Sequence, residues 1–148
     1  MFFRQFILVF ALVFSLAGAA HADLDAYLQD LRISARADLG GFQAEVGARF
    51  GTPRAQVDIA FGSLDDPAVA AVCLWLSVRS GHPVERVIAQ YRTHKGQGWG
   101  ALAKSLGIKP GSADFKALKA GNLGWNPGGN GNNPDKGQGR GKDKKKEK

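Results

Sequence analysis

The densest local signal for chemistry lies in one glycine-rich stretch, Gly96 to Ser112, which contains Trp99. Closely spaced glycines before a helix can cradle phosphate groups, but such sites need a preceding strand and the spacing GxGxxG or GxxxxGK[ST]. Neither spacing is present, and no strand is expected before this stretch. We therefore expect no nucleotide or other cofactor here. Gly98 and Gly100 would instead permit a tight turn beside Trp99 and fix the start of a helix onto the core.

Catalytic and metal-binding groups are sparse. His82 and His94 are the only histidines after residue 22, and each falls at an expected helix boundary. His82 directly precedes Pro83, which we expect to be the first residue of a helix. The sequence has no HExxH or CxxC motif and no cluster with metal-ligand spacing. Asp65 and Asp66 precede a proline, which is typical of a helix cap rather than an acid–base pair. The residues favour a non-enzymatic protein with no catalytic or metal site. The enzymatic alternative is a periplasmic hydrolase of envelope material, with Glu85, His82 or His94 in a cleft.

The first 22 residues indicate the compartment. Arg4 gives a positive start, residues 6–17 are apolar except for Ser15, and small residues at 20 and 22 precede a cut before Asp23. This order is typical of a secretory signal peptide. The apolar run is shorter than the roughly 20 residues of a spanning helix, although a retained anchor is the alternative. We expect an exported protein, periplasmic or extracellular, with no transmembrane segment after cleavage.

Charge is concentrated behind the expected domain. Residues 23–125 carry 12 Lys and Arg against 10 Asp and Glu, whereas 126–148 carry seven against three. The tail has no large apolar side chain, so we expect a disordered Gly/Asn/Lys-rich segment. Flexible cations bind polyanions through counterion release. The candidate polyanion-binding residues are Lys136, Arg140, Lys142, Lys144, Lys145, Lys146 and Lys148. The alternative is a solubilising tail with no dedicated partner.

Apolar spacing predicts helices throughout residues 23–125 and no strand pair. Asp23 is a candidate cap for the first helix, and the glycines at 40 and 41 leave open whether the second helix continues the first. Thr52 and Asp66 each precede a proline and are expected to cap helices. The stretch 67–80 is apolar on most sides, including Leu74, Trp75 and Val78, and is therefore expected to be central. The single cysteine, Cys73, is expected to pack there as a buried small hydrophobe.

The last two expected helices form a helix-turn-helix-like corner. The candidate structural residues of this corner are Gly98, Trp99, Gly100, Gly107, Pro110, Ser112 and Phe115. A nucleic-acid binder using residues 98–120 and the tail is the third interpretation. It is disfavoured because the second helix carries only Lys116 and Lys119 as cations and the signal peptide exports the chain. The sequence thus predicts an all-α fold, a compact multi-helix bundle of short helices with this C-terminal corner.

Several stretches resemble a group of small, exported, uncharacterised bacterial proteins. The resemblance is strongest in Pro83-Val84-Glu85-Arg86-Val87, Lys95-Gly96-Gln97-Gly98-Trp99-Gly100, Leu106-Gly107-Ile108-Lys109-Pro110-Gly111-Ser112 and Phe115-Lys116-Ala117-Leu118-Lys119. It implies a signal peptide in front and a Gly/Lys-rich tail behind, and it supplies no activity. We therefore expect signal peptide 1–22, helical domain 23–125 and tail 126–148. The expected partner is an anionic envelope component or a protein, and no oligomeric state is indicated.

Overall fold

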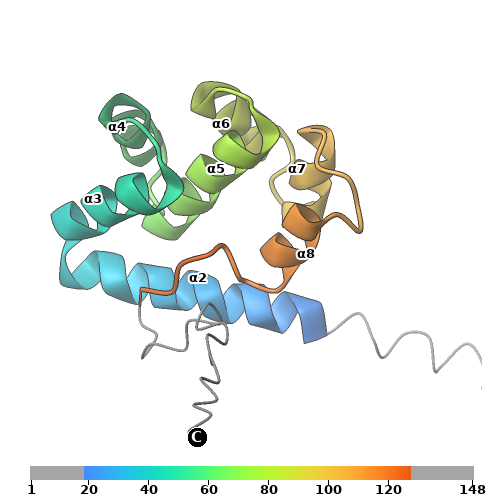
Figure 1. The fold of residues 1–148 in the computed structure, drawn as a ribbon, viewed down its shortest axis with the longest axis horizontal. Helices are drawn as coiled ribbons and strands as arrows, with labels where there is room; N and C mark the ends of the chain where they lie inside the picture. Colours follow the sequence, from blue (N-terminus) through green and yellow to red (C-terminus); the bar gives the residue numbers. More distant parts are fainter. Residues whose placement is uncertain (1–18, 128–148) are drawn as a thin grey trace, which may run out of the picture.

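The computed structural model describes residues 19–127. The predicted signal peptide up to residue 18 and all seven candidate polyanion-binding residues of the tail lie outside this part. Residues 19–127 fold into seven helices and contain no strand (Figure 1). The helices are α2 (Ala19–Ala37), α3 (Leu39–Phe50), α4 (Arg54–Ser63), α5 (Pro67–Ser80), α6 (Val84–Thr93), α7 (Trp99–Ser105) and α8 (Ala113–Lys119). The predicted all-α bundle with its C-terminal corner is confirmed. None of these helices combines the length and hydropathy of a membrane-spanning segment.

The helix α5 is the centre of the bundle. It contacts α2, α3, α4 and α6, and every side chain from Ala68 to Leu76 is buried. Cys73 lies in this run, and burial raises the pKa of its thiol to about 12. The predicted central position of α5 and the predicted burial of Cys73 are therefore confirmed. Val78 also widens the apolar stripe of α5 in the sequence, but its side chain is 49% exposed.

The long helix α2 runs along one side of the bundle and contacts α3, α5 and α8 (Figure 1). It begins at Ala19, so Asp23 lies inside the helix and does not cap it. The glycine pair at 40 and 41 belongs to a new helix, because Asp38 leaves helical geometry and its carboxylate accepts a hydrogen bond from the Gly41 N–H (2.9 Å). This N-cap interrupts the helical backbone at Asp38 and separates α2 from α3. Helix α3 can therefore fold back against α2.

The other helix ends follow local rules, with two corrections. Gly51 and Gly81 end α3 and α5 in the left-handed conformation (φ 63° and 73°), as C-terminal glycines commonly do. The two corrections concern Pro53 and Pro83, which adopt extended geometry and take the N-cap positions of α4 and α6. Both helices therefore begin one residue later than predicted, and Thr52 is not a cap. Its buried hydroxyl has no hydrogen-bond partner within residues 19–127.

The chain after α8 returns along α2 as a C-terminal strap, defined here as residues 121–125 (Figure 1). Leu123 and Trp125 are buried. The Tyr27 hydroxyl donates to the backbone carbonyl of Trp125 (2.7 Å), and the Trp125 indole N–H donates to Glu45 Oε1 (2.9 Å). The strap thus ties the end of the domain to both α2 and α3. Trp125 is the last buried side chain among residues 23–127.

Candidate functional site

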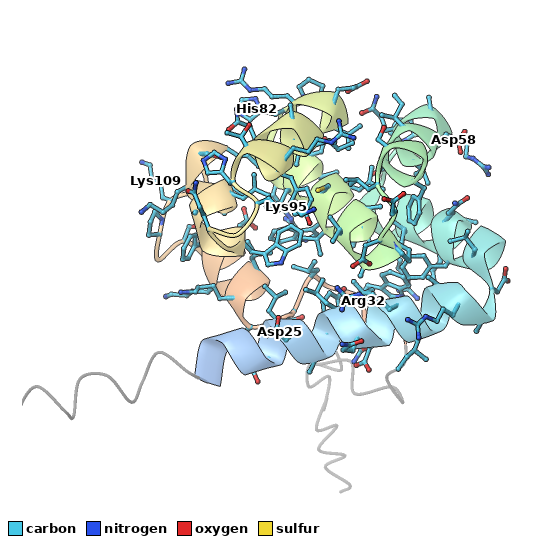
Figure 2. The ribbon with its side chains drawn as sticks, turned by 180° about the vertical axis from the view of Figure 1, so that it is seen from behind. Asp25, Arg32, Asp58, His82, Lys95 and Lys109 are labelled. Carbon is cyan, nitrogen blue, oxygen red and sulfur yellow. The ribbon has the colours of Figure 1, made fainter. Side chains whose placement is uncertain are left out.

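A cavity of about 370 Å³ opens between α2, α5 and the loop that joins α6 to α7. Its apolar wall comes from Leu28 on α2, Val69 on α5 and Leu102 on α7. Figure 2 looks onto the molecule from behind, with Arg32 on α2 and Lys95 on the loop above it. Both residues line the cavity. Segments far apart in the sequence therefore converge on one concave surface.

The loop over the cavity owes its shape to two glycines. Gly96 and Gly98 have φ values of 91° and 90°, which side chains with a Cβ rarely adopt. Between them the Gln97 N–H donates to the His94 carbonyl (2.9 Å). The chain therefore turns tightly after α6 and presents Trp99 as the first residue of α7. We call residues 95–99 the glycine loop.

The predicted role of Gly98 is confirmed, and that of Gly100 is corrected. Gly100 lies within α7, where a Cβ would stand 3.4 Å from Cζ of Phe115. Its lack of a side chain therefore serves the close approach of α8 rather than a turn. Gly107 (φ 85°) follows α7, and the Ser112 N–H donates to the Lys109 carbonyl across Pro110 (3.1 Å). Ser112 then caps α8 by accepting from the Phe115 N–H (3.2 Å), as predicted.

An aromatic pair stands at the wall of the cavity. The rings of Tyr91 and Trp99 are stacked, with centroids 5.5 Å apart and planes 24° from parallel. Both side chains are half-buried. Burial raises the pKa of the Tyr91 hydroxyl, so this group stays protonated at neutral pH. The pair offers a polarisable apolar surface of the kind on which planar groups pack.

An ion pair between α2 and the start of α5 forms the polar wall. Arg32 donates from Nε (2.9 Å) and Nη2 (2.7 Å) to Oδ2 of Asp66, and Oδ1 of Asp66 accepts from the Ala68 N–H (2.9 Å). Burial alone would raise the pKa of Asp66. The hydrogen bonds and charge of Arg32, together with the backbone N–H groups, outweigh it and hold the pKa below its usual value. Asp66 therefore both caps α5, as predicted, and anchors Arg32, which the sequence did not reveal.

The Asp66→Asn variant tests this ion pair. A carboxylate whose pKa is lower in the folded than in the unfolded chain stabilises the fold above its unfolded pKa. That contribution is lost as the pH falls through its folded pKa. We expect the variant to be about 1–2 kcal/mol less stable than the parent at pH 7. The difference should shrink between about pH 5 and pH 2. Urea unfolding at several pH values measures it.

The exposed pair of Arg54 and Asp58 is the matched control. Its contact distance is also 2.7 Å, but both side chains are more than half exposed, whereas Arg32 and Asp66 are 28% and 33% exposed. Surface pairs within a helix contribute about 0.3–0.5 kcal/mol. Asp58→Asn should therefore change stability little. Equal effects of the two substitutions would contradict the structural role of Asp66.

Two further polar groups belong to the cavity. The Nδ1 atom of His94 lies 2.9 Å from the Gln90 carbonyl oxygen, which can only accept, so Nδ1 carries the hydrogen. In the neutral ring Nε2 is then an acceptor. Lys95 is exposed on the glycine loop and takes part in no ion pair within residues 19–127. Because Arg32 and Asp66 cancel each other, Lys95 leaves the cavity with a net positive charge.

The hydrolase candidates do not converge. Of His82, Glu85 and His94, only His94 lines the cavity. His82 lies at the start of α6, away from Arg32 in Figure 2, and its backbone bonds to Ser77 and Ser80. Glu85 is exposed. Across the described part of the chain, no three or more His, Cys, Asp or Glu side chains are grouped as metal ligands would be.

The corner of α7 and α8 carries several exposed cations. Lys104, Lys109 and Lys116 are exposed, and Nζ of Lys119 lies 5.5 Å from the centre of the Phe115 ring. Helix α8 has seven residues and is therefore about 10 Å long.

Of the seven candidate structural residues, Gly98 and Trp99 line the cavity. The other five, Gly100, Gly107, Pro110, Ser112 and Phe115, shape α7, α8 and the connection between them.

In comparisons with known proteins, no family model, curated protein or solved structure matches this chain.

Proposed function

We propose that the protein is exported and acts as a non-enzymatic binding protein. Its ligand site is the cavity beneath the glycine loop, and its basic tail attaches it to an anionic polymer or lipid of the envelope. The observation that carries this proposal is that the most distinctive sequence segment builds the wall of a cavity. Concave sites with apolar walls and a few converging polar groups are the usual form of small-molecule sites.

The chemistry of the wall favours binding over catalysis. Both oxygens of Asp66 already accept hydrogen bonds, and its lowered pKa keeps it ionised. The raised pKa of Tyr91 keeps its proton in place. His94 also lines the cavity, but its Nδ1 hydrogen is already donated to the Gln90 carbonyl oxygen. A general acid–base mechanism needs groups that change protonation near the working pH.

The order of the first 22 residues supports export. A positive start with Arg4, an apolar run over residues 6–17 and small residues at 20 and 22 precede the predicted cut before Asp23, as in secretory signal peptides. Cleavage before Asp23 would remove the first turn of α2. The helix would keep its buried residues Leu24, Tyr27, Leu28, Leu31 and Ala35. The single cysteine is buried, so the domain folds in an oxidising compartment without a disulfide of its own. The resemblance to small exported proteins agrees with this proposal.

The experiment begins with the full chain produced with ¹⁵N label in a bacterial host. We expect the protein recovered from the periplasmic fraction to begin at Asp23 by mass spectrometry. We then expect a mixture of small neutral, anionic and cationic aromatic compounds to shift the amide signals of Leu28, Gly96 and Gly98. Trp99→Ala should abolish these shifts. Val78→Ala, which removes an exposed side chain outside the cavity, should preserve them.

Two results would contradict the proposal. If the uncut chain stays in the cytoplasm, the proposal that the protein is exported is wrong. If the compounds shift only amide signals outside the cavity, or if the cavity amides still shift in Trp99→Ala, the cavity is not the ligand site.

A further inference from the structure

We infer that the cavity takes an organic anion with a planar apolar body, such as an aryl carboxylate. This inference rests on the proposed role of the cavity as the ligand site. It adds the chemical class of what binds there. The class follows from three features of the wall. These are its size and apolar faces, the one carboxylate whose two oxygens both already have a donor, and the cation on the glycine loop that has no ion-pair partner in the described residues.

The apolar faces determine the body of the ligand. Leu28, Val69 and Leu102 line the cavity together with the stacked rings of Tyr91 and Trp99. A volume of about 370 Å³ is near the lower end of ligand pockets, which span about 300–1,000 Å³. One or two fused rings would fill such a space. Flat rings also gain favourable offset or edge contacts with aromatic side chains.

The hydrogen-bonding groups determine the charge of the ligand. Asp66 has no oxygen left without a partner, because Arg32 and the Ala68 N–H occupy both. Arg32 spends Nε and one Nη2 hydrogen on this pair, so its Nη1 hydrogens are unused by residues 19–127. A guanidinium has five N–H donors and no acceptor. This wall therefore offers donors to an incoming group and few acceptors.

The glycine loop adds the charge that remains uncompensated. Lys95 lines the cavity without an ion-pair partner in the described residues. The other polar side chains of the wall are Tyr91, which stays neutral, and His94, whose Nδ1 donates to the Gln90 carbonyl. A carboxylate between Lys95 and Arg32 would receive charge-assisted hydrogen bonds. An ammonium group or a polyhydroxylated body would lose hydration without finding enough acceptors.

The test compares four probes that differ in one property at a time. Naphthalene-2-carboxylate is the anion, 2-naphthamide its neutral isostere, 2-naphthylmethylamine the cation, and glucuronate an anion on a polyhydroxylated body. Each is titrated into the mature protein recovered after export, and Kd is measured from the cavity amide shifts. We expect the naphthoate to bind about tenfold more tightly than the amide. The amine and glucuronate should bind more weakly than the naphthoate.

Variants locate the source of the preference. Lys95→Gln should weaken naphthoate binding about tenfold and leave amide binding unchanged. Lys104→Gln is the matched control, since it removes an exposed lysine of the neighbouring helix that does not line the cavity. It should change neither affinity.

Opposite results separate this inference from the proposed function. If the amide, the amine or glucuronate binds the cavity as tightly as naphthoate, the inferred class is wrong while the cavity remains the ligand site. An equal loss of naphthoate affinity in Lys104→Gln would also overturn the inferred class. If no aromatic probe of any charge shifts the cavity amides, the proposed ligand site fails as well.

Discussion

Replacing Trp125 with alanine is expected to lower the free energy of unfolding by about 3–5 kcal/mol, the range observed when a buried aromatic is cut back to alanine. The side chain is 7% exposed. Its ring lies 5.4 Å from that of Phe42 and 6.2 Å from that of Phe50, measured between centroids. Its indole N–H bonds to Glu45. The substitution therefore removes the ring that packs on Phe42 and Phe50 of α3 and the hydrogen bond to Glu45.

Chemical unfolding followed by circular dichroism measures this loss. Trp125→Phe is the control, because it keeps an aromatic ring in place and removes the hydrogen bond to Glu45. We expect that variant to lose about 1–2 kcal/mol. A loss below about 1 kcal/mol for Trp125→Ala, the scale of an ordinary surface change, would show that the C-terminal strap does not pack on the domain in solution.

The strap also bears on the cavity, because α2 takes part in both. Tyr27 on one side of the helix donates to the strap, while Leu28 and Arg32 line the cavity. The buried Tyr27 hydroxyl, whose pKa is raised by burial, stays protonated and keeps this bond over a wide pH range. The strap thus holds α2 at Tyr27, next to the residues by which α2 lines the cavity. The strap is a positioning element for Arg32 rather than part of the site.

Helix positions were predictable where local chemistry decides them. The end of α3 at Phe50 follows from Gly51, whereas its start at Leu39 was left open and is set by the Asp38 cap. Asp66 and Ser112 cap α5 and α8 as predicted. The starts of α4 and α6 were both predicted one residue too early, and the two errors have one cause. A proline can stand at the N-cap or at the first helical position. The pairs Thr52-Pro53 and His82-Pro83 do not indicate which of the two applies, and the structure shows extended N-cap geometry at both prolines.

The cavity and the strap were harder to foresee. The turn in the glycine loop was predicted. The ion pair in the polar wall of the cavity was not, because Arg32 and Asp66 lie 34 residues apart and belong to different helices. Hydrophobic periodicity detects helices, so it gave no signal for residues 121–125, where Leu123 and Trp125 pack from irregular backbone. Contacts of this kind depend on how helices cross, and crossing is a property of the whole bundle.

Replacing Gly121 with alanine is expected to cost about 2–4 kcal/mol, because two penalties add at this position. Its φ is +63°, and a Cβ built there would stand 2.7 Å from Cβ of Tyr27 and 2.8 Å from the backbone oxygen of Asp23. Both atoms belong to α2, whose backbone cannot yield as a flexible side chain would. The left-handed conformation accounts for about 1–2 kcal/mol, and the overlap for the rest.

Gly124 supplies the matched control within the same strap. Its φ is +80°, but a Cβ there would meet nothing within 4 Å. Gly124→Ala should therefore cost only the conformational part, about 1–2 kcal/mol. The difference between the two variants, measured by thermal and urea unfolding, isolates the close approach of the strap to α2. Equal losses would mean that the chain after α8 stands off from Tyr27, and the tie between the strap and the cavity helix would then be absent.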